Sequence, residues 1–214
     1  AIPDARLWNT WLESLPMPIG MAVLTFGLYR WHQEQLTLME HMVKRERYQR
    51  EDRAIDPVTR LASHDYLMQQ LGMELGRARR ERFPVSLILI DIDDFDRINR
   101  RHGVSEGDRV LRSVTELLLL NLREGDLLCR YGADRFAVML PHTGETMAAI
   151  IARELTEAVT HFAYKTGREG ERIVITASAG AALALSGSAE ELVDRASRAL
   201  AKAKQQGPGH HSAA

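Results

Sequence analysis

Residues 85–92 read VSLILIDI, a continuous apolar run that ends in acidic residues. A run of this kind is typical of a buried strand. Two shorter apolar runs, residues 127–131 and 136–140, enclose the tetrapeptide Gly-Ala-Asp-Arg, and this spacing predicts a β-hairpin. The buried strand and the hairpin are therefore the expected centre of the fold.

Helices are expected around this centre, because apolar residues recur there at helical spacing. The predicted helices cover residues 61–81, 105–122, 147–161 and 189–205, and a strand rich in small residues covers 173–183. The resulting order is β-α-β-β-α-β. We therefore predict an α/β (α+β) fold, a palm or ferredoxin-like split βαβ sheet with helices on one face, preceded by a long N-terminal helix.

The composition excludes several classes of protein. With 28 basic and 29 acidic residues the net charge is -1, so nothing indicates a nucleic-acid-binding protein. The single cysteine, Cys129, excludes an internal disulfide, and no Cys/His spacing indicates a structural zinc site. The length of 214 residues fits one domain with an extended appendage.

The N-terminal part, residues 1–31, is hydrophobic and is predicted to form a transmembrane helix. Residues 12–31 hold a nearly uncharged run with aromatic residues near both ends, which suits the two membrane interfaces. Basic residues follow this run, so its C-terminal side is expected in the cytoplasm. A buried or dimer-forming helix and an uncleaved signal-like segment are the alternatives.

Residues 32–54 are charged and helical in composition, with an apolar seam at Leu36, Met39 and Val43. This seam predicts a connecting or coiled-coil helix that pairs with its copy in a homodimer, and a single solvated helix is the alternative. Asp56-Pro57 ends the helix and marks the start of a domain over residues 55–207. Residues 208–214 are expected to form a disordered tail.

Carboxylates follow the first predicted strand, at Asp91, Asp93 and Asp94. A carboxylate at the end of a buried strand costs free energy unless it is paired, and a divalent cation is the usual partner. The predicted sheet brings Asp134, in the hairpin turn, near Asp91. Two acids placed this way hold the metals of palm-type nucleotidyl transferases, whereas ordinary turn residues are the alternative.

Five segments resemble, in order, the motifs of the GGDEF family, the diguanylate cyclases, over roughly residues 55–207. The segments are DPVTRL (56–61), DIDDFDRIN (91–99), GVSEGDRVL (103–111), RYGADRFAVMLP (130–141) and ALAKAKQQG (199–207). The resemblance implies that two GTP-loaded domains meet to make cyclic di-GMP. It also implies Mg²⁺ at Asp91, the Ile92 carbonyl and Asp134, guanine contacts from Asn99 and Asp108, and GTP binding by the retained Lys204.

The signature departs from the family pattern, since Ala133 stands for its second glycine and Arg135 for its glutamate. Asp96 replaces a lysine expected to face phosphate, and Pro208 replaces an arginine. A unit charge pair at about 4 Å and an effective dielectric constant near 20 is worth ~4 kcal/mol. If Arg135 faces the pocket, metal binding is therefore unfavourable, and we expect a degenerate active site in which Asp134 is vestigial.

Residues 123–126, Arg-Glu-Gly-Asp, resemble the RxxD inhibitory site of the family at the family's distance from the signature. A guanidinium can fork onto a guanine edge or a phosphate, while a carboxylate accepts from guanine N–H groups. The resemblance implies a cyclic di-GMP site at Arg123 and Asp126, with Arg153 as the candidate that completes it. An ordinary helix end with Gly125 as its cap is the alternative.

The leading hypothesis is a cyclic di-GMP signalling protein whose degenerate GGDEF domain is a receptor for this dinucleotide. It is expected at the bacterial inner membrane with its GGDEF domain in the cytoplasm, or wholly in the cytoplasm. A weak, product-inhibited diguanylate cyclase that uses GTP is the first alternative. A dimerisation or recruitment scaffold that binds neither nucleotide is the second. An unknown downstream protein is expected as a partner.

Overall fold

The computed structural model describes residues 28, 31–32, 55–165, 172–184 and 187–213. The chain divides into two compact units, Ala1–Asp52 and Arg53–Ala214, and the second contains the sheet. The predicted membrane segment and the predicted connecting helix lie outside the described residues, apart from Leu28, Trp31 and His32. No helix in the described part of the chain combines the length and the apolar character that a bilayer crossing requires.

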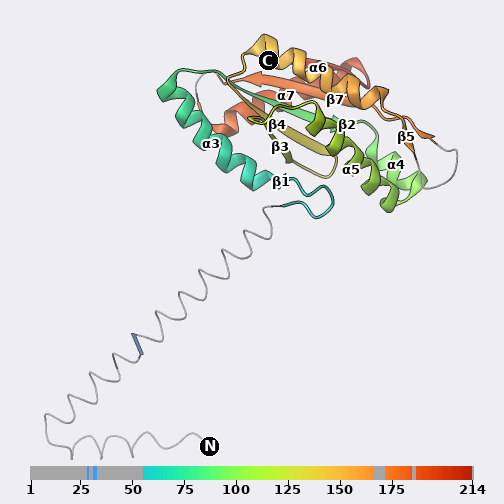
Figure 1. Cartoon of the computed structure of the whole chain (residues 1–214), viewed down its shortest axis with the longest axis horizontal. Coiled ribbons are helices and arrows are strands. Elements are labelled where there is room, and N and C mark those ends of the chain that lie inside the picture. The colour runs from blue at the N-terminus through green and yellow to red at the C-terminus, as the bar shows by residue number, and fades with distance from the viewer. Residues whose placement is uncertain (1–27, 29–30, 33–54, 166–171, 185–186, 214) are drawn as a thin grey trace, which may run out of the picture. The chain divides into compact units, whose positions relative to one another are not determined.

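The second unit is built on a six-stranded mixed sheet with the strand order β1-β3-β4-β2-β7-β8, and β5 pairs with β6 in a separate ribbon (Figure 1). The elements in chain order are β1 (Ala62–Ser63), α3 (His64–Glu81), β2 (Val85–Ile92), α4 (Phe95–His102), α5 (Val104–Leu120), β3 (Leu127–Arg130), β4 (Arg135–Pro141), α6 (Glu145–His161), β5 (Tyr164–Lys165), β6 (Arg172–Ile173), β7 (Ala177–Leu183), α7 (Ala189–Gln206) and β8 (His211–Ala213). The predicted α/β fold is confirmed.

Strand β2 lies at the centre of the sheet and pairs in antiparallel fashion with β4 and β7. In this register Asp91 is opposite Arg135 on one side and Ser178 on the other. The last residues of β2 therefore lie between the start of β4 and the start of β7. This strand end is where the candidate site is built.

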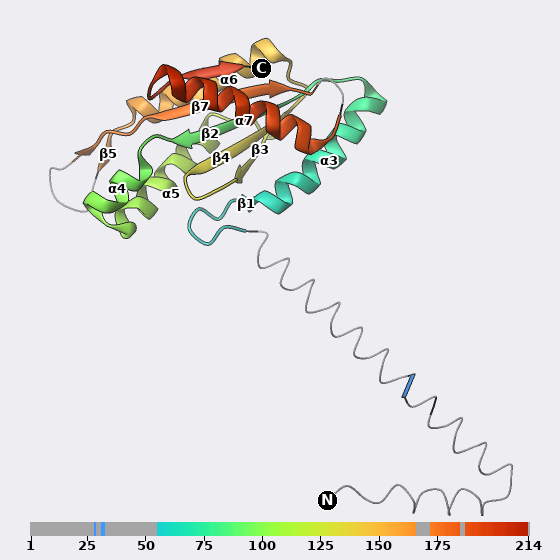
Figure 2. The ribbon, with the colours of Figure 1, turned by 180° about the vertical axis from the view of Figure 1, so that it is seen from behind.

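Helices cover both faces of the sheet, so the prediction of a single covered face is wrong. Helices α5 and α6 lie on one face (Figure 1), and α3 and α7 lie on the other (Figure 2). Every position of β2 is buried, with Ile88 and Ile90 packed on the first side and Leu87 and Leu89 on the second. A strand that is apolar on both faces requires cover on both, because neither face can be left to solvent.

Three local differences from the predicted elements concern the edges of the fold. Helix α3 begins at His64, because Ala62 and Ser63 pair in parallel with β3 as β1. Helix α4 was absent from the predicted elements. The predicted strand 173–183 is interrupted between β6 and β7, where the carbonyl of Thr176 accepts from the backbone N–H of Asp93 at 2.9 Å.

The C-terminal residues are ordered where a disordered tail was expected. Residues 211–213 form β8, which pairs in parallel with β7, and the N–H of Ala179 donates to the carbonyl of His210 at 2.9 Å. Gly209 also donates its N–H to Oδ2 of Asp93 at 2.9 Å. The edge of β7 supplies hydrogen-bond partners to the backbone of this segment. The short polar sequence His-Ser-Ala has no strand pattern of its own.

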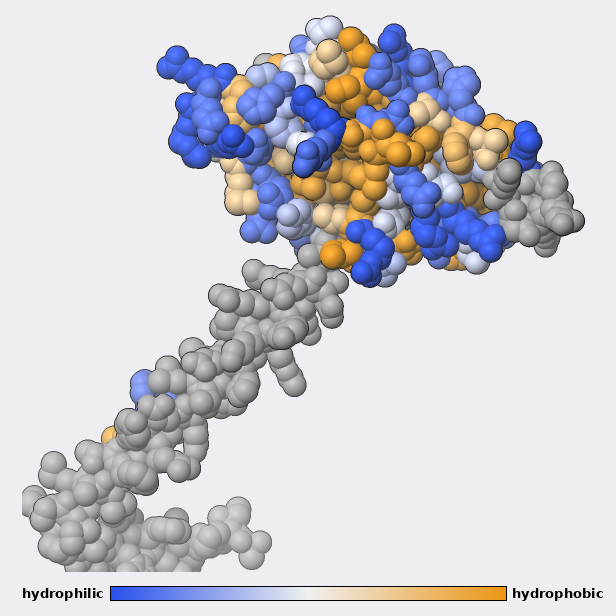
Figure 3. Space-filling view, viewed as in Figure 1, coloured by the Kyte–Doolittle hydropathy of each residue, from blue (hydrophilic) through white to orange (hydrophobic). Residues whose placement is uncertain are grey.

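The surface of the α5–α6 face is partly apolar, and Figure 3 shows these residues gathered between polar margins. Leu119 and Leu120 at the end of α5, and Met147 in α6, are large exposed apolar residues. Helix α5 leads from this surface directly into the segment that carries Arg123.

Candidate functional site

Asp91 at the end of β2 is bound by two basic side chains. Arg135 donates from Nε to Oδ2 of Asp91 at 2.6 Å, and Lys204 donates from Nζ to Oδ1 at 2.5 Å. The side chain of Asp91 is only 3% exposed, whereas those of Arg135 and Lys204 are 48% and 39% exposed. Arg135 therefore points to the first predicted metal ligand, and each carboxylate oxygen of Asp91 accepts from a different cation.

Two packing features bring these cations to Asp91. Arg135 is the first residue of β4 and lies opposite Asp91 in the strand register. Lys204 is in the last turn of α7, which packs closely on β7 at Gly180. A Cβ on Gly180 would lie 2.1 Å from the backbone nitrogen of Leu200, so the absence of a side chain at Gly180 sets how near α7 approaches the sheet.

The electrostatic effects agree with this geometry. The hydrogen bond to Asp91 is the main cause that raises the pKa of Arg135. Burial, followed by the charge of Asp91, raises the pKa of Asp134 above its ordinary value. Asp134 is therefore close enough to sense Asp91, as predicted, and the carbonyl of Asp134 accepts from the N–H of Ile92 at 3.1 Å.

These residues do not fit a divalent metal as they are folded. Each oxygen of Asp91 already accepts a charge-assisted hydrogen bond from a cation, so a metal ion bound here would lie beside two positive charges that repel it. Across residues 55–165, 172–184 and 187–213, no group of three or more His, Cys, Asp or Glu side chains is arranged to hold a metal ion. The assignment of Asp91, Ile92 and Asp134 as magnesium ligands thus stays a prediction from resemblance, and the geometry of Asp91 opposes it.

Arg130, in β3, holds the hairpin turn and was not among the predicted site residues. It donates from Nε to the carbonyl of Gly132 at 2.6 Å and from Nη2 to the carbonyl of Ala133, and its guanidinium lies 4.9 Å from the centre of the Phe136 ring. Burial lowers the pKa of Arg130, while Asp56, Asp134 and Asp108 oppose this shift. A basic residue in the apolar run LLCRY was the sequence signal for this role.

Asp93 has a structural role. Its carboxylate accepts from the hydroxyls of Thr176 at 2.7 Å and Ser178 at 2.8 Å, and from the N–H of Gly209 at 2.9 Å. These bonds tie the end of β2 to the start of β7 and to the C-terminal segment. Asp93 therefore stabilises the fold through these hydrogen bonds.

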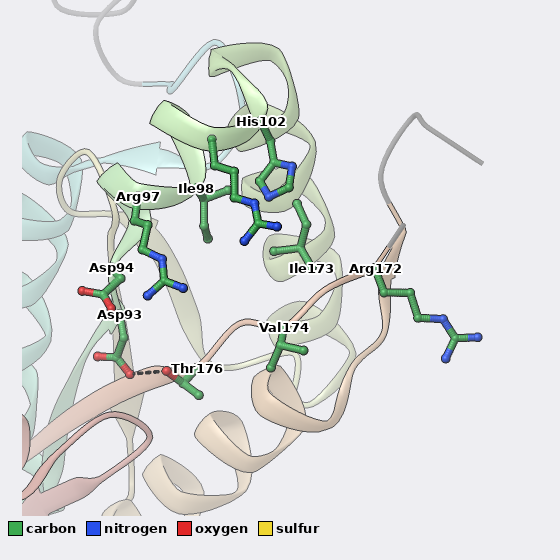
Figure 4. A pocket seen from close by; sticks show the side chains of 10 residues that line it. Asp93, Asp94, Arg97, Ile98, His102, Arg172, Ile173, Val174 and Thr176 are labelled. Carbon is green, nitrogen blue, oxygen red and sulfur yellow. Dashed lines mark hydrogen bonds between the residues drawn. The ribbon is translucent and has the colours of Figure 1, made fainter. Parts of the chain in front are cut away.

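A pocket of about 310 Å³ lies beside this region, between α4 and residues 172–176. Figure 4 shows Arg97 and His102 on α4, with Asp93 joined to Thr176 by a hydrogen bond at the pocket wall. Arg101 and Arg172 also line it, but none of the predicted metal ligands does. The pocket is thus lined by both basic and acidic side chains, and it does not include Asp91, Arg135 or Lys204.

The two predicted guanine contacts lie on helices that pack together. Gly103 joins α4 to α5 with a φ of 90°, which favours glycine, and the turn brings Asn99 against Gly107. A Cβ on Gly107 would lie 1.9 Å from Oδ1 of Asn99, an oxygen that is buried without a hydrogen-bond partner in the described chain. Asp108 follows Gly107 directly. Their contact with guanine remains a prediction, and the unpaired oxygen is consistent with a missing donor.

The remaining departures from the family motifs lie on the surface. Asp96 is exposed in the first turn of α4, where a negative charge favours the helix dipole. Ala133 is exposed in the hairpin turn, and Pro208 is exposed after α7. The structure shows no side-chain hydrogen bond or ion pair from Asp96 to the other described residues.

Arg123 and Asp126, which follow α5, are joined by two hydrogen bonds. Arg123 donates from Nε to Oδ1 of Asp126 at 2.9 Å and from its backbone N–H to Oδ2 at 3.2 Å. Its Nη2 donates to the hydroxyl of Thr143 at 2.7 Å and to the carbonyl of Pro141. The side chain of Asp126 is 3% exposed and that of Arg123 is 55% exposed, so the carboxylate positions a guanidinium that solvent still reaches.

Arg153 is not joined to this arrangement. It is exposed on α6, and its Nε lies 3.8 Å from Oε1 of Glu157. In the described part of the chain no hydrogen bond or ion pair links Arg153 to Arg123 or Asp126. The structure thus brings together two of the three residues predicted for the dinucleotide site.

The sequence and the fold both have known relatives. The family described as diguanylate cyclase, GGDEF domain, matches residues 53–210. Diguanylate cyclase DgcP of Pseudomonas aeruginosa is 34% identical over 164 residues, which are 74% of this chain and 24% of that protein. Response regulator PleD of Caulobacter vibrioides is 36% identical over 154 residues, 71% of this chain and 34% of that protein. The match thus spans only a minor part of these relatives.

Solved structures show the same fold. The coiled coil and GGDEF domain of DgcB from Caulobacter crescentus, in complex with c-di-GMP, has a TM-score of 0.73 and 25% identity, covering 87% of this chain and 99% of that chain. Diguanylate cyclase SiaD of Pseudomonas aeruginosa, in complex with its activator SiaC, has a TM-score of 0.71 and 29% identity, covering 98% of this chain and 89% of that chain. The chain therefore belongs to the GGDEF domain family, the family of the diguanylate cyclases of cyclic di-GMP signalling.

Proposed function

We propose that this domain is a receptor for cyclic di-GMP, which it binds through the guanidinium of Arg123. The observation that carries the proposal is that Arg123 is fixed by Asp126, Pro141 and Thr143 while its side chain remains 55% exposed. Nε and Nη2 are used by these contacts, so the two N–H donors of Nη1 are the ones offered to a guanine edge or a phosphate, with little loss of side-chain entropy on binding. The DgcB structures in complex with c-di-GMP support this class of ligand.

In this proposal Asp126 does not contact guanine directly. Both of its oxygens accept from Arg123 and its side chain is almost fully buried. Asp126 therefore acts as a positioning residue for Arg123. Arg153 is retained as a second contact, which it makes from α6 after it leaves its ion pair with Glu157.

The proposed function is tested by calorimetric titration of the full chain with cyclic di-GMP. We expect Arg123→Ala to weaken binding about 10- to 150-fold, because a hydrogen bond to a charged group is worth ~1.5–3 kcal/mol. Asp126→Asn keeps the shape but weakens the hold on Arg123, so its loss is expected to be smaller. Arg109→Ala, which removes an exposed arginine paired with Glu106 on α5, is the control and leaves binding unchanged. Absence of binding by wild type, or equal binding by Arg123→Ala, would contradict the proposal.

The cyclase alternative is favoured by one observation, the unpaired buried oxygen of Asn99 beside Gly107 and Asp108. This arrangement supports binding of GTP, with or without turnover. Incubation with GTP and magnesium tests it, and we expect no cyclic di-GMP. Product that appears with wild type and disappears with Asp134→Ala would establish the weak cyclase in place of the receptor.

The scaffold alternative predicts that neither nucleotide changes the melting temperature.

Further parts of our proposal are a membrane anchor at residues 12–31, a homodimer through the N-terminal helix, and a location at the bacterial inner membrane with the GGDEF domain in the cytoplasm. An unknown downstream protein is also part of the proposal, and the complex of SiaD with its activator SiaC is a precedent for a protein partner of a related domain. Fractionation of bacteria that express the full chain tests the anchor, since we expect the chain in the membrane fraction.

A further inference from the structure

The carboxylate of Asp91 is neutralised from within the protein. It lies at the buried end of β2, and each of its oxygens accepts a short hydrogen bond from a different basic side chain, Arg135 at 2.6 Å and Lys204 at 2.5 Å. The two cations come from the start of β4 and the last turn of α7, so three elements converge on one carboxylate. A buried carboxylate requires such compensation, which in metal sites comes from the ion.

The carboxylate of Asp134 also lies at this strand end. Asp134 lies near enough to Asp91 for its pKa to be raised by that carboxylate, and the charges of Arg135 and Lys204 act on Asp134 in the opposite direction. Two fixed positive charges thus face two carboxylates without any added ion. A divalent cation bound to Asp91 would share a carboxylate that already accepts two charge-assisted hydrogen bonds, and it would lie beside a guanidinium that cannot lose its proton.

We propose that Arg135 and Lys204 together substitute for the divalent metal ion at Asp91, so that this carboxylate is a structural anion that binds neither Mg²⁺ nor Mn²⁺. Arg135 is the decisive residue, because it stands where the family signature has an acid. The inference is independent of cyclic di-GMP binding at Arg123, since the two arrangements share no residue.

The substitution has a consequence for any nucleotide at this site. A guanidinium carries five N–H donors, of which the bond to Asp91 uses one, and the Arg135 side chain is 48% exposed. A phosphate group would therefore meet N–H donors in the place of a metal ion. Binding of GTP near Asn99 and Asp108, where it occurs, is expected to be the same with magnesium as with EDTA.

The experiment is a titration of the full chain with Mn²⁺. Binding is measured by electron paramagnetic resonance, as the loss of the signal of free Mn²⁺. We expect no Mn²⁺ binding at Asp91 in wild type. We expect Arg135→Glu to bind Mn²⁺ with an affinity at least tenfold higher than any affinity measured for wild type. Lys202→Glu is the matched control, because it makes the same change of charge on an exposed position of α7 whose neighbours one turn away are Arg198, Ala199, Gln205 and Gln206. This control is expected to behave as wild type.

Circular dichroism establishes whether each variant is folded. If Arg135→Glu does not fold, Arg135→Gln decides instead, since it frees one oxygen of Asp91 without adding a charge and is expected to gain Mn²⁺ affinity over wild type. Mn²⁺ binding by wild type that Asp91→Asn abolishes would overturn the inference, whereas binding that survives Asp91→Asn lies elsewhere and leaves it standing. A requirement of wild type for magnesium in binding GTP, or no gain by either Arg135 variant, would also overturn it.

Discussion

Lys204 donates from Nζ to Oδ1 of Asp91 at 2.5 Å, although the two residues are 113 positions apart in the chain. The bond joins the last turn of α7 to the end of the central strand, and Arg135 holds the other oxygen of the same carboxylate. Because Asp91 is buried, these cations contribute to the stability of the fold as well as to the chemistry of the site.

Removal of Lys204 is expected to destabilise the domain. Lys204→Met takes one cation from a buried carboxylate, and a hydrogen bond to a charged group contributes ~1.5–3 kcal/mol. Urea unfolding of the full chain measures the change in the free energy of unfolding. Lys202→Met, two residues earlier on an exposed position of α7, is the control, with an expected change within about 0.5 kcal/mol. Equal effects of the two variants would contradict the role of Lys204.

Asp134→Asn is expected to stabilise the protein in a manner that depends on pH. Burial and the charge of Asp91 raise the pKa of Asp134 in the folded state above the ordinary value of 3.8, so the folded protein holds this proton more tightly than the unfolded chain. Wild type therefore loses stability as pH rises through the folded pKa, whereas asparagine does not ionise. We expect a higher Tm for the variant at pH 7 and a smaller difference below pH 3.8.

The control for this experiment is Asp194→Asn, which alters an exposed carboxylate paired with Arg198 on α7. Exposed pairs contribute little, so its Tm is expected to follow that of wild type across the pH range. A Tm of Asp134→Asn at or below that of wild type at pH 7 would contradict the prediction.

Gly180→Ala is expected to destabilise the fold by about 1–3 kcal/mol or more, because overpacking forces backbone to shift. The added Cβ would lie 2.1 Å from the nitrogen of Leu200 and 2.5 Å from the carbonyl oxygen of Ala196, and backbone atoms cannot rotate away. Chemical unfolding measures the effect. Gly72→Ala in α3 is the opposite control, since nothing lies within 4 Å of its Cβ and alanine favours a helix by roughly 0.5–1 kcal/mol. Two changes of the same sign would contradict the account.

Cys129 is expected to be unreactive in the folded protein. It is fully buried, and burial raises the pKa of its thiol to about 12, so little thiolate is present at pH 8. Ellman's reagent should label the thiol in urea and leave it unlabelled without denaturant. Labelling of the folded chain within minutes would show that β3 is more accessible than the structure indicates.

The main elements of the fold could be predicted because each carries its own local pattern. Strand β2 has the predicted bounds, and the two hairpin strands, α5, α6 and α7 differ from their predicted bounds by three residues or fewer. Helix α4, with eight residues, is too short for its spacing to be distinctive. Strands β1 and β8 are formed by pairing with neighbours, so neither has a pattern that the sequence displays.

The candidate site could be identified only as a set of residues. Motif order selected Asp91, Asn99, Asp108, Arg123 and Asp134, but the direction of Arg135 depends on strand register. The roles of Arg130 and Asp93 depend on carbonyls and hydroxyls in other segments, which no local pattern reveals. The nearly complete burial of Asp126, which no local pattern reveals, supports the proposal that Asp126 positions Arg123 and does not contact the ligand.

The sequence by itself determined which family the chain resembles, where its central strand and hairpin lie, and that the signature carries an arginine in place of an acid. Only the tertiary structure decided that this arginine and Lys204 converge on Asp91, that helices cover both faces of the sheet, and that the C-terminal residues add a strand. The physical reason is that periodicity and motif order are local properties of the chain, whereas the neutralisation of a buried charge depends on contacts between distant segments.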